Sequence, residues 1–331
     1  MRRAICREFA DPVALEVVEE PDPTPSSGEV LVLVDAASAT FVDGVIARGK
    51  YQVKPPLPYS PGMALCGRVA AVGPDTPSAP PVGTPVAALR MGFGCYTTHA
   101  VVPAGSVVPL PDGLDPATAV GAIENYSTLL FAVTHRVAIG AGDQVVVLGA
   151  GGGIGLAAVD VARSAGARVV AVASSEQKRS LAAAAGAAVT MDYYDLKNSI
   201  RSATGGGADI VIDPVGGEAA ESALRALGPG GRFCVVGFAS GDIPRLPANI
   251  VLLRNRSIIG VDWGDWARAD DGAGPSRALL VDLFGRFTRG ELTPPEPMVA
   301  RLEDAAAILQ GYADRRLSGR WVLQPQAGLR A

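Results

Sequence analysis

A glycine-rich turn between an apolar strand and a helix of small residues constrains this chain more than any other feature. The apolar run 145–148 enters the segment Gly149-Ala150-Gly151-Gly152-Gly153-Ile154-Gly155, and a helix is expected from Leu156 to Ala165. Glycines let a backbone turn tightly and approach a pyrophosphate, because no Cβ stands in the way. The unpaired amides at the start of the following helix attract phosphate. The segment therefore predicts the first strand-turn-helix unit of a Rossmann nucleotide-binding fold.

The spacing of the glycines departs from the usual pattern at one position. The best register is Ala150-x-Gly152-x-x-Gly155, which puts alanine at the tight turn. Glycine clusters also form ordinary loops, and an S-adenosylmethionine site can look similar. A second apolar strand at 167–173 follows at βαβ spacing and favours the dinucleotide site. We therefore expect the cofactor to contact Ala150, Gly151, Gly152, Gly153 and Ile154.

The end of the second strand indicates which cofactor is bound. A site for NAD places Asp or Glu there to bind the ribose 2′-hydroxyl, whereas a 2′-phosphate needs donors instead of the acid. Here Ala173 occupies that place, and two hydroxyls and two cations follow it, at Ser174, Ser175, Lys178 and Arg179. These groups can make charge-assisted hydrogen bonds to a phosphate, so we predict NADPH. The alternative is that a serine only caps the next helix while the two cations are solvated.

Composition and charge exclude several classes of partner. The 331-residue chain suggests two domains, and its net charge of −4 comes without a basic stripe, so we expect no nucleic-acid partner. Gly, Pro or a charge interrupts every apolar run before it reaches the length of a membrane span, and the N-terminus lacks the apolar segment of a secretory signal. The four cysteines and two histidines are scattered. We therefore expect no metal site, reduced cysteines and a cytoplasmic location.

The order of the expected elements predicts two kinds of sheet. Before the glycine turn, short apolar runs between Gly and Pro suggest a small β-barrel-like domain, with strands at 29–37, 67–73 and 84–88. A helical pattern covers 119–136. Strands and helices then alternate, with strands at 145–148, 169–173, 209–212, 232–236 and 257–261. This alternation requires an α/β fold with a parallel, doubly wound sheet. A polar loop after Trp266, a helix at 276–288 and a strand at 320–323 follow.

Several motifs in a fixed order carry a resemblance over nearly the whole chain. They are Pro21–Val32, Arg48–Pro58, Pro61-Gly62, Ala150–Gly155, Asp213–Gly217, Val235–Phe238 and Gly319–Leu323. In these segments the chain resembles the zinc-free, zeta-crystallin-like quinone oxidoreductase branch of the medium-chain dehydrogenase/reductase superfamily. The resemblance implies a Rossmann domain, residues 123–265, inserted into a GroES-like catalytic domain formed from residues 1–122 and 266–331. It also implies a homodimer joined through the Rossmann sheets.

The resemblance also implies further cofactor contacts, carried over position by position. They comprise a hydroxyl near the nicotinamide, a tyrosine beside the adenosine phosphate, four residues at strand ends along the cofactor groove and two residues whose backbone binds the carboxamide. In this order they are Thr128, Tyr193, Pro214, Val215, Gly237, Phe238, Val261 and Trp263. For each of them a packing role is the alternative, above all for the two large aromatic side chains.

Two further positions bear on catalysis. Zinc-using relatives carry a cysteine and a Gly-His-Glu segment where this chain has Thr40 and Gly62-Met63-Ala64, and neither place holds a ligand. Zinc-free members commonly carry Asn-Pro-x-x-Asp where this chain has Thr40-Phe41-Val42-Asp43, so Thr40 keeps a polar group there. Enoyl-thioester reductases of the superfamily bring a tyrosine from the same Gly-x-Tyr context to the substrate. Tyr51 is therefore the candidate proton donor, and packing along the cleft is its alternative role.

These features together predict a reductase for a small-molecule substrate. The expected enzyme uses NADPH without zinc and reduces a quinone, or the activated C=C bond of an enone or alkenal, by hydride transfer. Without a metal to polarise a carbonyl, a conjugated acceptor is the more suitable substrate. One alternative is an enoyl-thioester reductase, which needs a basic patch such as Arg245, Arg254 and Arg256. The other is a non-catalytic structural or adaptor protein that binds NADPH.

Overall fold

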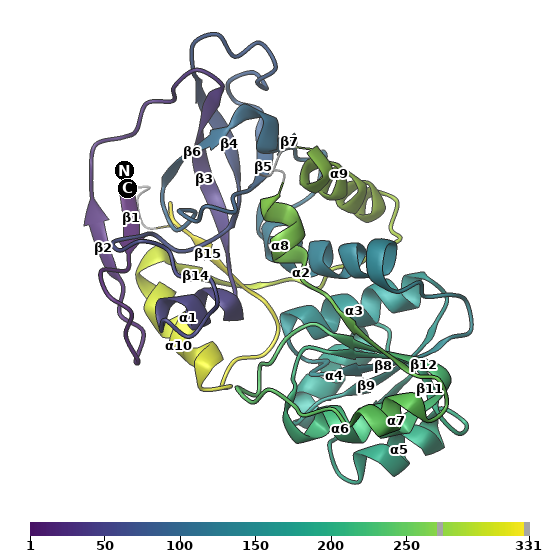
Figure 1. Cartoon of the computed structure of the whole chain (residues 1–331). Coiled ribbons are helices and arrows are strands. Elements are labelled where there is room, and N and C mark those ends of the chain that lie inside the picture. The colour runs from purple at the N-terminus through teal and green to yellow at the C-terminus, as the bar shows by residue number, and fades with distance from the viewer. Residues whose placement is uncertain (270–273, 328–331) are drawn as a thin grey trace. The chain divides into compact units, whose positions relative to one another are not determined.

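The computed structural model describes residues 1–269 and 274–327. Contacts between residues divide the chain into two compact units (Figure 1). Unit 1 consists of Met1–Glu124, Gly264–Thr288 and Pro295–Ala331, and unit 2 consists of Asn125–Trp263 and Arg289–Pro294. Both ends of the chain therefore contribute to unit 1. The domain boundaries given above from the sequence stay predictions.

A six-stranded parallel sheet forms the centre of unit 2. Its strands, in spatial order, are β10 (Val189–Met191), β9 (Arg168–Val172), β8 (Gln144–Leu148), β11 (Ala208–Asp213), β12 (Leu227–Val235) and β13 (Ser257–Gly260). Counted along the unit, this is the order 3-2-1-4-5-6 of a doubly wound nucleotide-binding sheet. The predicted parallel α/β fold is thus confirmed. The winding reverses between β8 and β11, and ligands of such sheets bind at the carboxyl ends of the strands beside this reversal.

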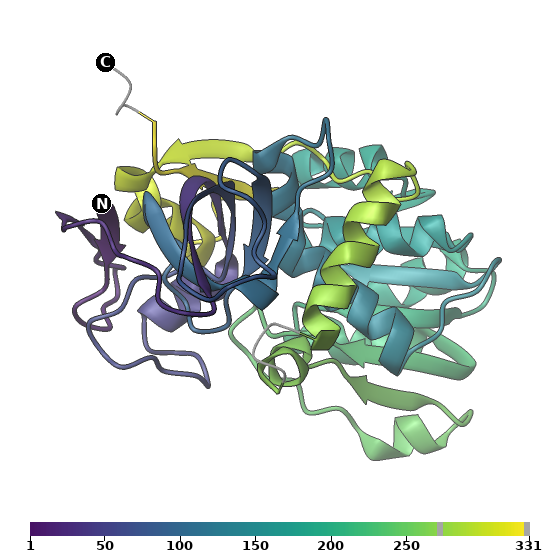
Figure 2. The same cartoon turned by 90° about the horizontal axis from the view of Figure 1, so that it is seen from above.

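Helices cover both faces of the parallel sheet (Figures 1 and 2). They form two contacting groups, α3 with α4 and α5 with α6 and α7. Their bounds are α3 (Gly153–Ser164), α4 (Glu176–Ala184), α5 (Leu196–Ala203), α6 (Gly217–Ala226) and α7 (Ala248–Leu252). Because both faces are covered, Val145, Val146, Val147 and Leu148 of β8 are all fully buried. This explains why β8 is a continuous apolar run rather than an alternating one.

Unit 1 contains a seven-stranded, mainly antiparallel sheet. Its path is β14 (Met298–Arg301), β15 (Trp321–Gln324), β3 (Glu29–Ala39), β4 (Ala64–Val72), β5 (Pro85–Leu89) and β7 (Val107–Pro109), and β6 (His99–Pro103) pairs with β3. The short strands β1 (Arg2–Ile5) and β2 (Glu16–Glu19) form a separate antiparallel pair. The long strand β3 pairs with β4, β6 and β15 and so organises the sheet.

The helices of unit 1 pack on this sheet and on one another. Helix α1 (Phe41–Ala47) lies against α10 (Ala305–Ala313), where a Cβ at Gly44 would be 2.9 Å from the carbonyl oxygen of Leu309. Helix α9 (Gly274–Thr288) contacts β7. Helix α2 (Pro116–Phe131) begins in unit 1 and ends in unit 2, where it continues as a π turn (Ala132–Arg136). Helix α8 (Trp263–Arg268) follows β13 where the chain returns to unit 1. Short 3-10 turns occur at Ala104–Ser106 and Leu302–Asp304.

Most of the predicted elements are present in the structure, and the strands that the sequence did not predict are short. The strands predicted before the glycine turn correspond to β3, β4 and β5, and the helix predicted at 276–288 corresponds to α9. Strands β1, β2, β6, β7, β10 and β14 were not predicted, because runs of three to five residues carry too little periodicity. The polar loop predicted after Trp266 falls partly on 270–273, outside the described residues.

None of the helices in the described ranges has both the length and the hydropathy that crossing a bilayer requires.

Candidate cofactor and active site

The turn after β8 has a conformation that explains its unusual spacing of glycines. Gly149 has a φ of +61°, which favours glycine, whereas Ala150 has no such φ. The Ala150 amide donates to the Val172 carbonyl oxygen at 3.0 Å, and the Gly152 amide donates to the Gly149 carbonyl oxygen at 3.0 Å. The left-handed residue therefore lies one position before Ala150. This corrects the sequence register, which put the tight turn at Ala150.

Three of the glycines differ in what surrounds them. A Cβ at Gly155 would overlap the Gly149 carbonyl oxygen and lie 2.6 Å from Ala150 Cα. A Cβ at Gly151 would overlap the Lys178 side chain and lie 2.9 Å from Lys178 Cα. A Cβ at Gly152 would meet only the Gly149 carbonyl oxygen, at 3.6 Å. Gly155 and Gly151 thus allow close packing, while Gly152 leaves the start of α3 open.

Helix α3 begins immediately after this open position. Gly152 is its N-cap and makes no side-chain hydrogen bond. The amides of Gly153 and Ile154 belong to the first turn, where a helix has no acceptor of its own for the N–H groups. Such amides bind phosphate readily. The turn therefore leaves open amides where the sequence predicts a pyrophosphate, and binding of the pyrophosphate there stays a prediction.

The segment after β9 places a helix cap and two cations beside the turn. Ser175 caps α4, and its hydroxyl accepts a hydrogen bond from the Lys178 amide at 3.3 Å. The Arg179 guanidinium donates to the Ala173 carbonyl oxygen at 3.2 Å, and Ser174 is exposed. Ser175 has the capping role that the sequence allowed. The Lys178 stem against Gly151 brings this segment next to the glycine turn.

Two other predicted residues contact the same turn. The Tyr193 hydroxyl accepts a hydrogen bond from the Gly149 amide at 3.0 Å. Burial raises the pKa of Tyr193. A Cβ at Gly149 would lie 2.7 Å from a methyl group of Val215, so Val215 packs directly on the turn. Residues of β8, β11 and the segment after β10 therefore meet at one edge of the sheet.

Hydrogen bonds stabilise the segment after β11 and join it to the segment after β12. The buried Asp213 carboxylate accepts hydrogen bonds from the amides of Val215 at 2.8 Å and Gly216 at 3.0 Å, and burial raises its pKa. The Pro214 carbonyl oxygen accepts a hydrogen bond from the Ala239 amide at 3.0 Å. A Cβ at Gly237 would lie 3.4 Å from that oxygen. The predicted groove residues Pro214 and Gly237 are thus neighbours.

The surroundings of the remaining predicted cofactor residues do not distinguish cofactor binding from packing. Phe238 and Thr128 are half-buried, and Thr128 lies on α2. Val261 and Trp263 are buried, which agrees equally with packing. The Val261 amide already donates to the Val235 carbonyl oxygen at 3.0 Å. A carboxamide would therefore have to use the Val261 carbonyl group rather than its amide.

Unit 1 contains a buried carboxylate that the sequence analysis did not single out. Thr40 caps helix α1, and its amide and hydroxyl donate to Asp43 Oδ2 at 2.9 and 2.8 Å. The Tyr96 hydroxyl donates to the same oxygen at 3.1 Å, and the Gly62 amide donates to Oδ1 at 3.3 Å. Burial raises the pKa of Asp43, while these hydrogen bonds oppose the rise. Asp43 therefore joins α1 to two segments distant in sequence.

A second buried carboxyl group, Glu124 of α2, belongs to the same unit. The Ser38 hydroxyl of β3 donates a hydrogen bond to it. Burial, and then the negative charge of Asp43, raise the pKa of Glu124 to about 8. Because Asp43 has four donors, it is the member of this pair that ionises first. Glu124 holds a proton at neutral pH.

Tyr51 lies in the loop after α1. It is half-buried and packs with Val53 and Met63 against the core of unit 1. Packing is thus part of its role, and the proton-donor role stays a prediction.

Comparisons with known proteins agree with these features. Residues 26–112 match the alcohol dehydrogenase GroES-like domain family, and residues 153–273 match the zinc-binding dehydrogenase family. The chain is 37% identical over 327 residues to quinone oxidoreductase-like protein 2 of Bos taurus, covering 97% of this chain and 92% of that protein. The chain belongs to the quinone oxidoreductase branch of the medium-chain dehydrogenase/reductase superfamily. The predicted family and the predicted GroES-like domain are therefore confirmed.

Two other similarities concern the cofactor and the substrate. The quinone oxidoreductase of Thermus thermophilus, solved alone and with NADPH, superposes with a TM-score of 0.82 and is 29% identical, covering 98% of this chain and 100% of that one. A mycocerosic acid synthase-like polyketide synthase of Mycobacterium tuberculosis is 31% identical over 312 residues, which are 92% of this chain and 14% of the synthase. Relatives of this chain therefore differ in size and in the reactions that their names suggest.

The name of one matched family mentions zinc, so the arrangement of possible metal ligands matters. Within 1–269 and 274–327, no three His, Cys, Asp or Glu side chains are grouped so that they could hold a metal ion. Thr40 uses its hydroxyl for the hydrogen bond to Asp43, and Met63 packs against the core of unit 1. The four cysteines are buried and unpaired.

One basic residue of the enoyl-thioester interpretation has a different role. Arg256 is buried, and its guanidinium donates to carbonyl oxygens of Leu227, Gly228 and Ile250. It therefore holds the connection between α6 and β12 together. Arg245 and Arg254 are exposed and are left as the basic residues of that patch.

Proposed function

We propose that this chain is an NADPH-dependent, zinc-independent reductase of quinones or of activated C=C bonds in enones and alkenals. The observation that carries the proposal is the glycine turn of unit 2, with an open helix N-terminus on one side and Lys178 packed against Gly151 on the other. This arrangement offers amides to a pyrophosphate and a cation to a nearby phosphate. The solved complex of the Thermus relative with NADPH supports it.

The choice of NADPH over NADH rests on what surrounds Ala173. No carboxylate stands at the end of β9, and the exposed Glu176 lies in the first turn of α4. Ser174, Ser175, Lys178 and Arg179 offer hydroxyl and cationic groups there. Carboxylates beside a dianionic phosphate would be repelled, whereas these groups can bind it.

When bound, NADPH supplies the hydride that adds to one end of the acceptor. The protein then has to deliver a proton to the other end, and we propose Tyr51 for this step. Thr40 would contact the nicotinamide or the substrate, with its hydroxyl oriented by the hydrogen bond to Asp43. Zinc independence is proposed because Thr40 and Met63 stand where zinc-using relatives carry ligands.

The further cofactor contacts form part of the same proposal. Tyr193 and Val215 would flank the adenosine side of the glycine turn, since both contact Gly149. Pro214, Gly237 and Phe238 would line the groove at the ends of β11 and β12. Thr128, Val261 and Trp263 would lie towards the nicotinamide, as the family resemblance implies.

The second candidate is an enoyl-thioester reductase, which the polyketide synthase relative favours. The buried position of Arg256 weakens it, because that residue cannot bind the phosphate of a carrier. A protein that binds NADPH without turnover is the third candidate. The name of the bovine relative, a quinone oxidoreductase-like protein, leaves this possibility open.

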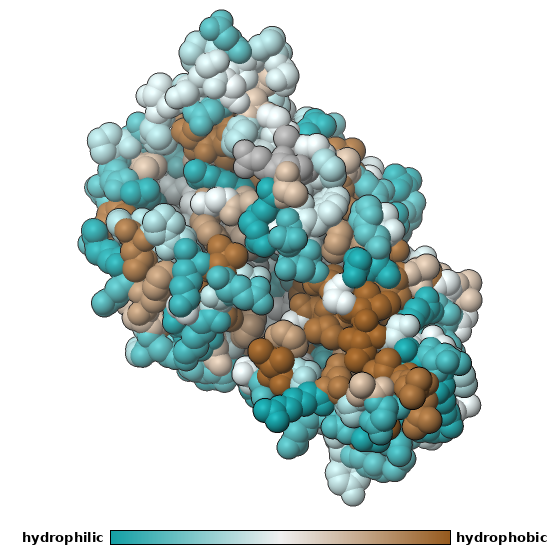
Figure 3. All heavy atoms as spheres, viewed as in Figure 1, coloured by the Kyte–Doolittle hydropathy of each residue, from teal (hydrophilic) through white to brown (hydrophobic). Residues whose placement is uncertain are grey.

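We also propose a homodimer joined through β13. This strand is at the edge of the sheet and pairs with β12 on one side. Ile258 on β13 and Leu252 and Leu253 just before it are exposed, and Figure 3 shows apolar side chains gathered over unit 2. Edge strands with exposed apolar residues pair readily with a second copy. We place the protein in the cytoplasm, because four unpaired thiols suit a reducing compartment.

An activity screen tests the proposal. Oxidation of NADPH is followed at 340 nm with ortho- and para-quinones, enones, alkenals and enoyl thioesters, with and without a metal chelator. We expect turnover with a quinone or enone that the chelator leaves unchanged. Preference for enoyl thioesters would select the second candidate, and NADPH binding without any turnover would select the third.

A further inference from the structure

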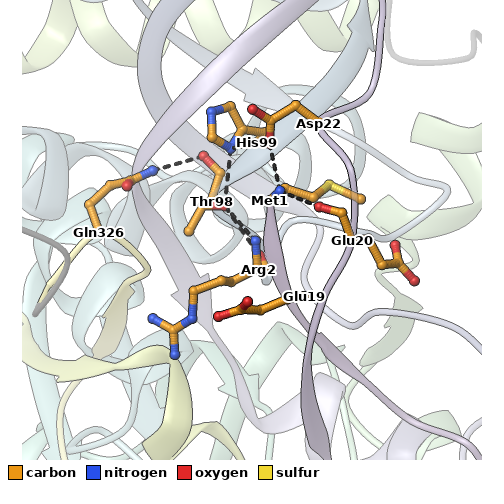
Figure 4. A pocket seen from close by; sticks show the side chains of 8 residues that line it. All are labelled: Met1, Arg2, Glu19, Glu20, Asp22, Thr98, His99 and Gln326. Atoms are coloured by element: carbon orange, nitrogen blue, oxygen red, sulfur yellow. Dashed lines mark hydrogen bonds and ion pairs between the residues drawn. The ribbon is translucent and has the colours of Figure 1, made fainter.

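Unit 1 has two neighbouring cavities that differ in charge. The first has a volume of about 240 Å³ and includes the carboxylates of Glu19, Glu20 and Asp22 (Figure 4). The second has a volume of about 310 Å³, and no Asp or Glu occurs among the described residues that line it. Both cavities share Met1 and His99. The charged side chains that line the second cavity but not the first are Arg3 and Arg90.

The basic groups of the first cavity have acidic partners. The amino group of Met1 lies 2.5 Å from an Asp22 carboxylate oxygen, and His99 Nδ1 lies 3.6 Å from the same oxygen. Arg2 pairs with Glu303. Figure 4 shows Asp22 beside His99 and Met1. The basic groups of the first cavity thus all have partners within the protein.

The second cavity contains a cation without such a partner. Arg3 is paired, because its Nε lies 2.9 Å from Glu20 Oε2. The Arg90 side chain makes no ion pair and no hydrogen bond with any residue in the described ranges. Arg90 is only partly exposed, so solvent does not fully compensate its charge. A guanidinium in this situation favours an anionic ligand.

The loop that follows Arg90 fixes the position of this guanidinium. The Arg90 amide donates to the Met63 carbonyl oxygen at 2.6 Å, and the Phe93 amide donates to the Arg90 carbonyl oxygen at 3.2 Å. A Cβ at Gly94 would lie 2.7 Å from Arg90 Nη1, so the guanidinium rests on the backbone of Gly94. Arg90 is therefore positioned by its own loop rather than by an acidic neighbour.

The loop holds a conformation that its residues would not adopt by themselves. Phe93 has a φ of +65°, a region that costs a bulky residue on the order of 1–3 kcal/mol, and Gly94 follows with a φ of +97°. The buried Phe93 ring packs edge-on against Tyr59, with 5.7 Å between ring centroids, and so anchors the loop. The amides of Gly92 and Gly94 make no hydrogen bond within the described part of the chain. Two donors therefore accompany the guanidinium.

We propose that the second cavity binds an oxyanion, the phosphate or carboxylate group of a small molecule, with Arg90 as its charged partner. The planar guanidinium can hold two oxygens of such a group at once, and the amides of Gly92 and Gly94 can donate to it. The cavity has the volume of a small-molecule site. The proposal does not depend on NADPH, because every residue it uses belongs to unit 1.

Anion titrations test this site. Inorganic phosphate and, separately, succinate are titrated at constant ionic strength into the full-length protein saturated with NADP⁺, so that the cofactor's own phosphate site is filled. We expect Arg90→Gln to weaken binding of the preferred anion at least tenfold. Arg68→Gln, which removes an exposed charge from β4 of the same unit, should leave it unchanged. Preference for phosphate or for succinate identifies which oxyanion the cavity takes.

A second measurement keeps the test decisive if Arg90→Gln does not fold. In the unchanged protein, the amide resonances of Gly92 and Gly94 should shift on addition of the preferred anion, and Arg90→Lys should bind it more weakly than the unchanged protein does. Equal binding by the unchanged protein and Arg90→Gln would overturn the proposal, and so would unmoved Gly92 and Gly94 resonances.

Discussion

The two units of the molecule build their polar sites in opposite ways. In unit 2 the groups offered to a ligand are mainly backbone amides at the start of α3, made accessible by glycines that follow one another in the chain. In unit 1 the two buried carboxyl groups, Asp43 and Glu124, are side chains that β3, α1 and α2 hold inside the unit. One site depends on the absence of side chains and the other on their ionisation.

This difference has a physical consequence. A backbone site is sensitive to any added Cβ and nearly insensitive to pH, since amides do not titrate in the usual range. A buried carboxyl pair responds strongly to pH, because burial raises the pKa of both groups. Substitutions in each unit separate the two behaviours.

The largest effect is expected at Gly155. Alanine there would place its Cβ against the Gly149 carbonyl oxygen and Ala150 Cα, so the turn has to move. We expect a loss of about 3 kcal/mol in the free energy of unfolding together with loss of NADPH binding. Denaturant unfolding and a cofactor titration measure the two quantities.

Gly152→Ala is the matched control, because its Cβ would meet nothing closer than 3.6 Å. It should leave the stability within about 0.5 kcal/mol and weaken NADPH binding alone, because the Cβ enters the open cradle. Equal destabilisation by both substitutions would contradict the distinction between packing and cradle glycines.

A somewhat smaller effect is expected for Tyr51→Phe. Loss of a general acid lowers turnover by roughly a hundredfold, whereas the ring still packs against the core of unit 1. Steady-state kinetics with a good quinone or enone should therefore show a lower kcat at an unchanged melting temperature. Tyr194→Phe, at an exposed position of unit 2, is the control. Unchanged turnover in Tyr51→Phe would remove the proton-donor role.

The smallest of these effects concerns the pH dependence of stability. The pKa of Glu124 is raised from 4.5 to about 8, so the folded protein binds a proton that the unfolded chain releases between these values. Stability from this group is complete below pH 4.5 and falls as the pH rises towards 8, by about 2 kcal/mol between pH 6 and pH 8.

Glu124→Gln should remove this part of the pH dependence, since the amide keeps a hydrogen-bonding partner for Ser38 without titrating. Unfolding measured at pH 6 and at pH 8 gives the difference directly. Glu218→Gln, at an exposed position of α6, is the control. An equally steep pH dependence in Glu124→Gln would show that Glu124 ionises as an ordinary carboxylate.

The same contrast explains what could be predicted from the sequence. The glycine turn, the flanking strand β8 and the cap Ser175 lie within about one βαβ unit, so local spacing is sufficient to predict them. The sequence register put the tight turn at Ala150, whereas the left-handed residue is the adjacent Gly149, and only the φ values distinguish the two.

The buried pair of unit 1 could not be predicted in this way. Ser38 and Glu124 are 86 residues apart, so no local spacing predicts their hydrogen bond. Arg90 presents the same difficulty, because a missing partner becomes visible only when the fold brings its neighbours together. The signal for Glu124 in the sequence is an acidic residue directly after the apolar and small-residue run Ala117–Ile123.

The most direct measurement compares the dissociation constants of NADPH and NADH in the unchanged protein and in Lys178→Ala. A charge-assisted contact to the 2′-phosphate contributes about 1.5–3 kcal/mol, which corresponds to roughly a tenfold to hundredfold preference for NADPH. Lys178→Ala should lose most of this preference by weakening NADPH binding alone, Ala173→Asp should invert it, and Lys197→Ala on the exposed face of α5 should keep it. Constants for NADPH and NADH that lie within a factor of about two of each other in the unchanged protein would contradict the assignment.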